Sequence, residues 1–164
     1  MEIRKSHITG RPLPIDTELS FTKEHFENSY PIRGMKSCHV EGEISKHEGL
    51  IEASLSIEGV AILEDSYTAE LFDKKLKVEG TYAILEDEDG EAEGFIVPGK
   101  VIELESLCLS ILRFSLPIKV LKKGSKLPEE VAGVHVYKEG EEHLEDAHSS
   151  PFDALADLDL PDHN

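Results

Sequence analysis

The sequence of 164 residues contains no tryptophan, only two cysteines, and aromatic residues that make up 6% of the chain. Two cysteines are too few for a disulfide framework or a thiolate metal site. We expect Cys38 and Cys108 to be buried and to behave as small hydrophobic residues. Because aromatic side chains are scarce, the composition also argues against a platform that stacks nucleic-acid bases.

Long hydrophobic runs are missing as well. No apolar run approaches the roughly 18 residues that a membrane-spanning helix needs. Residues 1–7 lack the apolar stretch of a signal peptide, so we expect a cytoplasmic protein that does not enter membranes. The apolar share of 39%, together with 12 glycines, allows a hydrophobic core at a length typical of one domain.

The motifs of common catalytic and cofactor sites are absent from the sequence. It contains no Gly-x-Ser-x-Gly elbow, no His-Glu-x-x-His zinc motif and no glycine-rich phosphate loop. The acidic stretch at residues 86–93 lacks the ligand spacing of an EF-hand calcium loop. We therefore expect a protein that is not an enzyme and that has no cofactor, metal or small-molecule substrate.

Positive charge is scarce and unevenly distributed. The chain carries 17 basic and 34 acidic side chains, a formal net charge of −17. Residues 127–164 contribute −10 of this charge, with Lys138 as their only base. Residues 106–128, called the basic segment below, contain no acid and five bases: Arg113, Lys119, Lys122, Lys123 and Lys126. These bases either protect the edge of a strand from pairing with another chain or form a partner-binding patch.

Apolar and polar residues alternate with the period of a half-buried strand in two segments, residues 38–45 and 51–58. If residues 46–49 form the hairpin loop, Ser45 pairs with Leu50 and Val40 faces Leu55. Both apolar faces then point to the same side. A slip of one residue would turn one face to water, so we expect this register.

A third long strand is predicted over residues 68–85, with a change of phase at residues 72–75 as at a β-bulge. The acidic residues 86–91 are then expected to form a hairpin loop. This loop leads into a short apolar run at residues 95–97.

The N-terminal region has weaker signals. Two prolines and a glycine predict an ordered loop over residues 9–20. One or two helical turns capped by Ser20 or Thr22 are expected to follow, and Pro31 ends them.

After residue 100 the period changes to that of a helix, which we expect near residues 103–115 and buried against the sheet. Pro117 ends this helix. Residues 118–121 are expected to return as an edge strand, and Val134 and Val136 to lie in another short strand.

The C-terminal residues are acidic and lack a clear pattern over residues 138–150, which predicts a mobile linker. A short amphipathic helix is expected near residues 151–158, capped by Ser150. Its first turn contains Pro151, and its apolar stripe consists of Phe152, Leu155 and Leu158.

Together these elements predict an α+β fold. A curved antiparallel sheet of long strands packs on one mostly buried helix near residues 103–115, and a short C-terminal helix lies near residues 151–158. We expect a single domain over residues 1–137, followed by an acidic linker and an amphipathic tail over residues 138–164.

The order of short motifs resembles that of a known bacterial family. Val-Glu-Gly-Glu-Ile at residues 40–44 leads into a strand-like stretch at residues 55–63, and Asp-Ser-Tyr-Thr-Ala-Glu follows at residues 65–70. An acidic insert, a helix that closes with Ser-Leu-Pro-Ile at residues 115–118, and Ser-Pro-Phe-Asp-Ala-Leu at residues 150–155 complete the series. Over residues 36–158 the chain resembles the YceD family, bacterial proteins linked to the accumulation of large-subunit ribosomal RNA.

Two places depart from the family pattern. Asp65 and Thr68 stand where many members carry a Cys-x-x-Cys pair, and Ser150-Pro151-Phe152 stands where members often carry Asp-Pro-Arg. Roles that depend on those cysteines or on that arginine are therefore not expected here. The resemblance implies a non-enzymatic ribosome-assembly factor.

The charge distribution indicates how such a factor would meet its partners. Ribosomal proteins are strongly basic, so a chain with a charge of −17 would attract them, and we expect the acidic tail to engage one. Contact with large-subunit ribosomal RNA is expected at the basic segment. The candidate partner-binding residues are Lys119, Lys122, Lys123 and Lys126 in that segment, and Pro151, Phe152, Leu155 and Leu158 in the tail. The alternative is a generic acidic protein-binding module unrelated to ribosomes.

Overall fold

The computed structural model describes residues 1–86, 93–126, 130–131 and 134–135. The chain divides into two units, residues 1–126 and residues 127–164. The linker predicted at residues 138–150 and the helix predicted near residues 151–158 lie outside the described residues. The predicted domain boundary after residue 137 stays a prediction.

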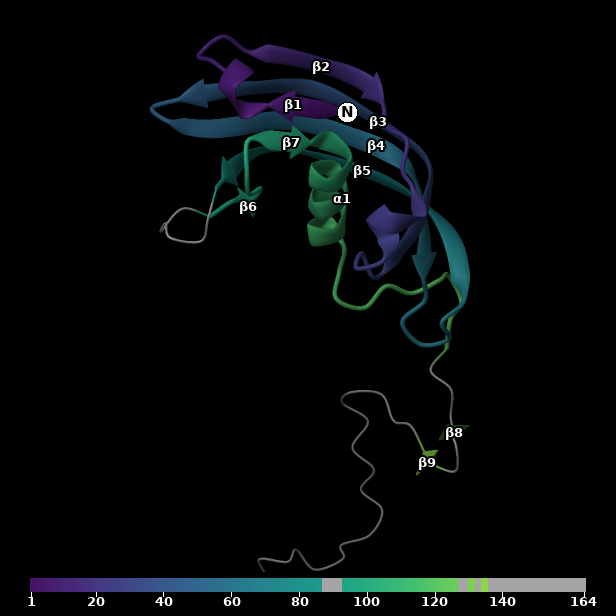
Figure 1. The fold of residues 1–164 in the computed structure, drawn as a ribbon. Coiled ribbons are helices and arrows are strands. Elements are labelled where there is room, and N and C mark those ends of the chain that lie inside the picture. The colour runs from purple at the N-terminus through teal and green to yellow at the C-terminus, as the bar shows by residue number, and fades with distance from the viewer. Residues whose placement is uncertain (87–92, 127–129, 132–133, 136–164) are drawn as a thin grey trace, which may run out of the picture. The chain divides into compact units, whose positions relative to one another are not determined.

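The first unit contains a five-stranded sheet, a two-stranded ladder and one α-helix among its described residues (Figure 1). In chain order the elements are β1 (Glu2–Arg4), η1 (Lys5–His7), β2 (Leu13–Glu18), η2 (Lys23–Phe26), β3 (Ile32–His47), β4 (Leu50–Glu64), β5 (Leu71–Leu85), β6 (Phe95–Ile96), β7 (Val101–Glu103) and α1 (Leu104–Ser115). The sheet has the order β2-β3-β4-β5-β6, and β1 pairs with β7. The predicted α+β class is confirmed.

The second unit contains a short antiparallel ladder. Its strands are β8 (Glu130–Val131) and β9 (Val134–His135). The strand predicted around Val134 is therefore present, whereas Val136 lies outside the described residues.

The hairpin between β3 and β4 is present, but its predicted register is wrong by two residues. His47 pairs with Leu50, and Val40 pairs with Ile57 instead of Leu55. The loop has only two residues, Glu48 and Gly49, with φ angles of 50° and 93°. Such a two-residue turn suits the twist of the strands. Because the shift is an even number of residues, each side chain keeps its predicted face.

The bulge predicted in the third long strand is also absent. The pairing of β5 with β4 runs without interruption from Leu71 opposite Glu64 to Ile84 opposite Ile51. The apparent change of phase arises because Leu71 is exposed on the outer face, at 58%. The register shifts of the sheet occur in β3, near its start at Ile32.

Three further predictions are corrected by the strand pairing. Residues 9–20 contain β2, which pairs with β3 as an edge strand and tolerates Pro14 there. The strands β5 and β6 do not form the predicted hairpin, because β6 pairs with β5 in parallel. The sheet is consequently mixed. Residues 118–121 form no strand, although all of them are described.

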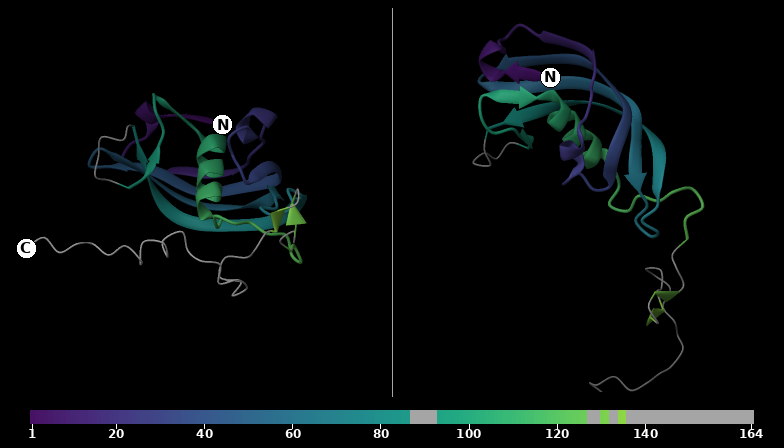
Figure 2. Two further views of the ribbon diagram at one scale, coloured as in Figure 1. Left: turned by 90° about the horizontal axis from the view of Figure 1, so that it is seen from below. Right: turned by 45° about the vertical axis from the view of Figure 1, so that its right-hand side comes forward.

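The long strands β3, β4 and β5 arch together, and α1 lies against the concave side of the arch (Figures 1 and 2). Gly42 permits a close approach of β3 to β4, where it pairs with Leu55. Gly42 has a φ of 147°, and an added Cβ would lie 2.0 Å from the carbonyl oxygen of Ser54. An L-residue with a side chain would be strained in that conformation.

One hydrophobic core joins the helix and the inner face of the sheet. From α1 it contains Leu104, Leu107, Cys108, Ile111 and Leu112, and from the long strands it contains Val40, Ile44, Leu55, Ile57, Leu76 and Ile84. The helix begins after Glu103 and ends before Leu116, which agrees with the predicted bounds. No helix among the described residues has the length and apolar character needed to cross a bilayer.

Candidate functional site

The residues that follow α1 form an irregular segment, residues 116–126, which we call the post-helix segment. Val120 anchors it, because its side chain is only 1% exposed. The Val120 N–H donates to Ser66 Oγ at 2.9 Å, and its carbonyl oxygen accepts from Ser66 N at 2.8 Å. The post-helix segment is thereby fixed to the loop that connects β4 and β5.

Asp65, in the same loop, makes the main polar connection to the post-helix segment. Its carboxylate accepts the backbone N–H of Lys122 at 2.6 Å and the hydroxyl of Ser125 at 3.0 Å. It also accepts the N–H groups of Tyr67 and Thr68, at 2.8 and 2.9 Å. The residue is 1% exposed.

These bonds favour the charged form of Asp65. Burial by itself raises the pKa of the carboxyl, but the four donors, led by the N–H of Lys122, outweigh burial and hold the pKa well below its ordinary value. A charged acceptor surrounded by donors is a strong and directional contact. Asp65 therefore determines how the post-helix segment is placed. The Asp65-Ser66-Tyr67-Thr68 sequence signals a local turn, but its partner 57 residues away gives no local signal.

The four predicted lysines all lie in or at the end of this segment, and all are exposed: Lys119, Lys122, Lys123 and Lys126. Lys122 Nζ lies 3.1 Å from a carboxylate oxygen of Glu70. They do not belong to a strand, so the interpretation that they protect a strand edge is wrong. Exposed lysines also occur on the part of β5 that precedes its pairing with β6: Lys74, Lys75 and Lys77.

A groove beside the helix is the main feature that the sequence did not predict. It has a volume of about 480 Å³, and we call it the Phe114 groove. It is lined by Tyr30, Pro31, Phe95, Ser110, Arg113, Phe114, Leu116, Pro117 and Ile118. Phe114 is 83% exposed and Ile118 is 97% exposed. The sequence predicts Phe114 at the end of a mostly buried helix and Ile118 in an edge strand, and neither prediction indicates that these two side chains face solvent.

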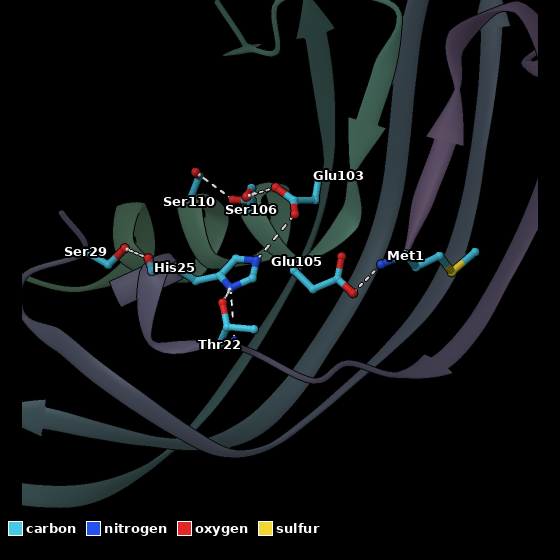
Figure 3. Close-up of polar contacts among 8 residues, drawn as sticks. All are labelled: Met1, Thr22, His25, Ser29, Glu103, Glu105, Ser106 and Ser110. Atoms are coloured by element: carbon cyan, nitrogen blue, oxygen red, sulfur yellow. Dashed lines mark hydrogen bonds and ion pairs between the residues drawn. The ribbon is translucent and has the colours of Figure 1, made fainter. Parts of the chain in front are cut away.

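A polar cluster lies where η2 meets the start of α1 (Figure 3). His25 Nδ1 receives the backbone N–H of Thr22 at 3.1 Å and lies 2.9 Å from Thr22 Oγ1. His25 Nε2 lies 3.5 Å from Glu103 Oε1, and Ser106 Oγ donates to Glu103 Oε2 at 2.5 Å. The series hydroxyl, imidazole and carboxylate has the outline of a hydrolase triad. Here the hydroxyl shares its acceptor with the N–H of its own residue, which is a capping arrangement, so we assign the cluster a structural role.

Glu105 belongs to the same region and holds the start of the chain. Its Oε1 accepts from the N-terminal ammonium of Met1, while its Oε2 is buried without a hydrogen-bond partner (Figure 3). Burial by itself raises the pKa of Glu105. The hydrogen bond from the ammonium and its positive charge outweigh burial, so the pKa of Glu105 lies below its ordinary value. The carboxylate thus fixes the N-terminus against α1.

The two cysteines are buried, as predicted. Burial raises the pKa of the Cys38 thiol to about 11. Burial also raises the pKa of Cys108 well above its ordinary value. Since the thiolate is the reactive form of cysteine, neither residue is activated as a nucleophile.

Within the part of the chain that the structure describes, no group of three or more His, Cys, Asp and Glu side chains could hold a metal ion. The predicted tail residues Pro151, Phe152, Leu155 and Leu158 lie outside that part. The four lysines lie on one irregular segment of the first unit. The chain matches no protein-family model, no curated protein and no solved structure in the comparisons.

Proposed function

We propose that this chain is a cytoplasmic, non-enzymatic factor in bacterial ribosome biogenesis that supports the accumulation of large-subunit ribosomal RNA. The observation that carries the proposal is the separation of charge along the chain. Four exposed lysines are held on the post-helix segment, whereas residues 127–164 carry a net charge of −10. A protein with these two parts can meet a polyanion at one and a basic protein at the other.

The resemblance to the YceD family supports this proposal through the order of its motifs. The motif residues 40–44 lie in β3, residues 55–63 in β4, and residues 65–70 in the loop before β5. Where many members carry two cysteines, Asp65 and Thr68 are linked by a hydrogen bond between the carboxylate and the backbone N–H. In this chain the loop is therefore ordered without cysteine chemistry.

The partners follow from charge. RNA phosphates are expected to approach Lys119, Lys122, Lys123 and Lys126, and a basic ribosomal protein is expected to bind the acidic residues 127–164. If both contacts form at the same time, the protein would bring a ribosomal protein to its binding site on the RNA. The protein would then act by assembly and not by a chemical reaction.

The direct test is a gradient profile of ribosomal particles from a strain that lacks the gene. We expect fewer mature large subunits and less large-subunit ribosomal RNA, with restoration by the full chain. A normal profile with normal RNA levels would refute the proposal.

The alternative, a generic acidic protein-binding module, predicts a different result in affinity capture from a lysate. Capture of ribosomal proteins that is lost at moderate salt supports the assembly factor, since exposed charges are screened under those conditions. Salt-insensitive capture of proteins unrelated to the ribosome would favour the alternative.

A further inference from the structure

The Phe114 groove presents an aromatic ring whose outer face is open. Phe114 packs edge-on against Phe95, with ring centroids 6.1 Å apart and an interplanar angle of 83°. Its exposure of 83% leaves the remaining ring surface in contact with solvent. Tyr30 contributes a third ring to the lining, after Phe95 and Phe114, and the guanidinium of Arg33 lies 5.3 Å from the Tyr30 centroid.

Glu64 and Glu70 lie outside the lining of this groove and pair with Arg33 at 2.6 Å and with Lys122 at 3.1 Å. The charge in the lining of the groove itself has one sign. Among the described residues that line it, Arg113 is the only charged one, and it donates to the carbonyl oxygen of Asn28 at 3.1 Å through one of its five N–H groups. The chain passes directly from Ile118 in the lining to Lys119. No acidic residue occurs between Glu105 and Glu129.

The groove and the post-helix segment are also joined by hydrogen bonds. The Tyr30 hydroxyl donates to Ser66 Oγ at 3.4 Å, and the same Oγ accepts the N–H of Val120. One loop therefore positions both an aromatic wall of the groove and the segment that carries the lysines. The groove and the post-helix segment, which share Leu116, Pro117 and Ile118, together form the candidate surface.

We propose that this surface binds single-stranded RNA, with an unpaired base stacked on Phe114 in the groove and phosphates held by Arg113 and the lysines of the post-helix segment. The inference rests on the proposed function and adds the site and the form of the RNA. Aromatic rings beside cations are the usual means of binding single strands, because every base has a face that can stack. A duplex keeps its bases stacked on one another, so it can use the cations but not the ring.

This proposal is compatible with the low aromatic content of the chain. A long stacking platform needs many rings, whereas a single unpaired base needs one exposed ring and nearby positive charge. An acidic peptide with apolar side chains is the competing occupant of such a groove. The regular phosphate charge of RNA matches the five cations of the basic segment better than the few carboxylates of a short peptide.

Fluorescence anisotropy with the full chain and a labelled oligouridylate of about twelve nucleotides tests the proposal. Phe114→Ala should weaken binding by roughly 5- to 100-fold, the range expected for one base–aromatic stack. Phe114→Tyr should retain binding, because it keeps a ring. A duplex of the same length should bind more weakly than the single strand and should be insensitive to Phe114→Ala.

Three further variants separate the contribution of the ring from that of the charges and from an effect on folding. Replacement of Lys119, Lys122, Lys123 and Lys126 by Gln should flatten the log–log salt dependence, whose slope should be about −3 for four phosphate contacts. The matched control replaces Lys74, Lys75 and Lys77 of β5 by Gln and should change the slope much less. Ile118→Ser changes another side chain of the groove lining and should also weaken oligouridylate binding. Because Ile118 is 97% exposed, this substitution should have little effect on folding.

Several results would overturn the inference. They are the absence of oligouridylate binding at low salt, equal binding of duplex and single strand, and an effect of Phe114→Ala no larger than that of Leu71→Ala outside the groove. Displacement of the oligonucleotide by a peptide of phenylalanine and glutamate at lower concentration than by unlabelled RNA would assign the groove to a protein partner. If the gene deletion changes the ribosome profile but a Phe114→Ala chain fully restores it, the inference fails while the proposed function stands. If oligouridylate binding depends on Phe114 but the gene deletion leaves the ribosome profile normal, the proposed function fails while the RNA-binding site stands.

Discussion

The core and the post-helix segment of the first unit are held in different ways. The core joins α1 to the inner face of the long strands through many apolar side chains that are excluded from water. The post-helix segment has one buried apolar anchor, Val120, and otherwise depends on the hydrogen bonds of Asp65 and Ser66. The stability of the core is distributed over many apolar contacts, whereas the attachment of the post-helix segment depends on three residues, Val120, Asp65 and Ser66.

This difference indicates how each region would respond to damage. Loss of one core side chain lowers the free energy of unfolding of the whole unit, because the core unfolds cooperatively. Loss of one contact to the post-helix segment can release that segment while the core stays folded. The lysines of the candidate RNA surface thus lie on a part of the chain that can be loosened separately from the scaffold, whereas Arg113 and Phe114 belong to α1.

The largest effect is expected from core truncation. Leu55→Ala and Ile111→Ala each remove a side chain that is almost fully buried, and each should cost about 2–5 kcal/mol of unfolding free energy. Urea denaturation followed by circular dichroism measures the loss. A cost below about 1 kcal/mol at both sites would show that the core is not cooperative.

Val120→Ala should have a smaller and more local effect. It removes two methyl groups from a buried side chain and should cost roughly 1–2 kcal/mol, at about 0.8 kcal/mol for each carbon removed from burial. The signature is faster tryptic cleavage after Lys122 and Lys123 with little change in the urea midpoint of the core. If the midpoint falls as far as in Leu55→Ala, the two regions form one cooperative unit.

Acid should also separate the two regions. Because the pKa of Asp65 is lower in the folded chain than in the unfolded chain, its contribution is complete above the unfolded value of about 3.9 and is lost as the pH falls below it. Proteolysis or hydrogen exchange of the post-helix segment should therefore increase as the pH falls below about 4 toward the lower pKa of the folded chain. Asp65→Asn removes this titration, so the variant should be loosened already at neutral pH and change little on acidification. A variant with the acid dependence of the wild type would exclude Asp65 as the titrating group.

The smallest effect is expected at Leu71. Leu71→Ala lies on the exposed outer face of β5 and should change the unfolding free energy by less than about 0.5 kcal/mol. A larger loss, in the same urea experiment, would mean that the outer face of β5 is covered in solution. This variant is also the control for the substitutions in the groove.

The sequence was sufficient for those features that depend on local period. The helix at Leu104–Ser115 and the inner faces of β3 and β4 follow from spacings of three to four and of two residues. The predicted register of the β3–β4 hairpin is wrong because Glu48 adopts a positive φ, which glutamate rarely adopts and which its residue type therefore does not indicate. The sequence pattern therefore predicts a four-residue loop at residues 46–49, whereas the turn contains only Glu48 and Gly49.

Features that depend on distant parts of the chain could not be predicted in this way. The parallel pairing of β6, the place of β2 at the sheet edge and the contact of Asp65 with Lys122 all join residues with no shared local pattern. For the candidate site, composition identified the lysines but not the groove. The exposure of Phe114 follows from where the chain leaves α1, and hydrophobic spacing carries no such information.

The pairing of β1 with β7 has a consequence for synthesis of the protein. Glu2 pairs with Glu103, and the carbonyl oxygen of Met1 accepts from Leu104 N at 3.0 Å. Residues 1–4 therefore find these partners only after residues 101–104 have been synthesised. Closure of a loop that long is entropically costly and slow, so the β3–β4 hairpin, whose strands are adjacent in the chain, can form well before the N-terminal strand is in place.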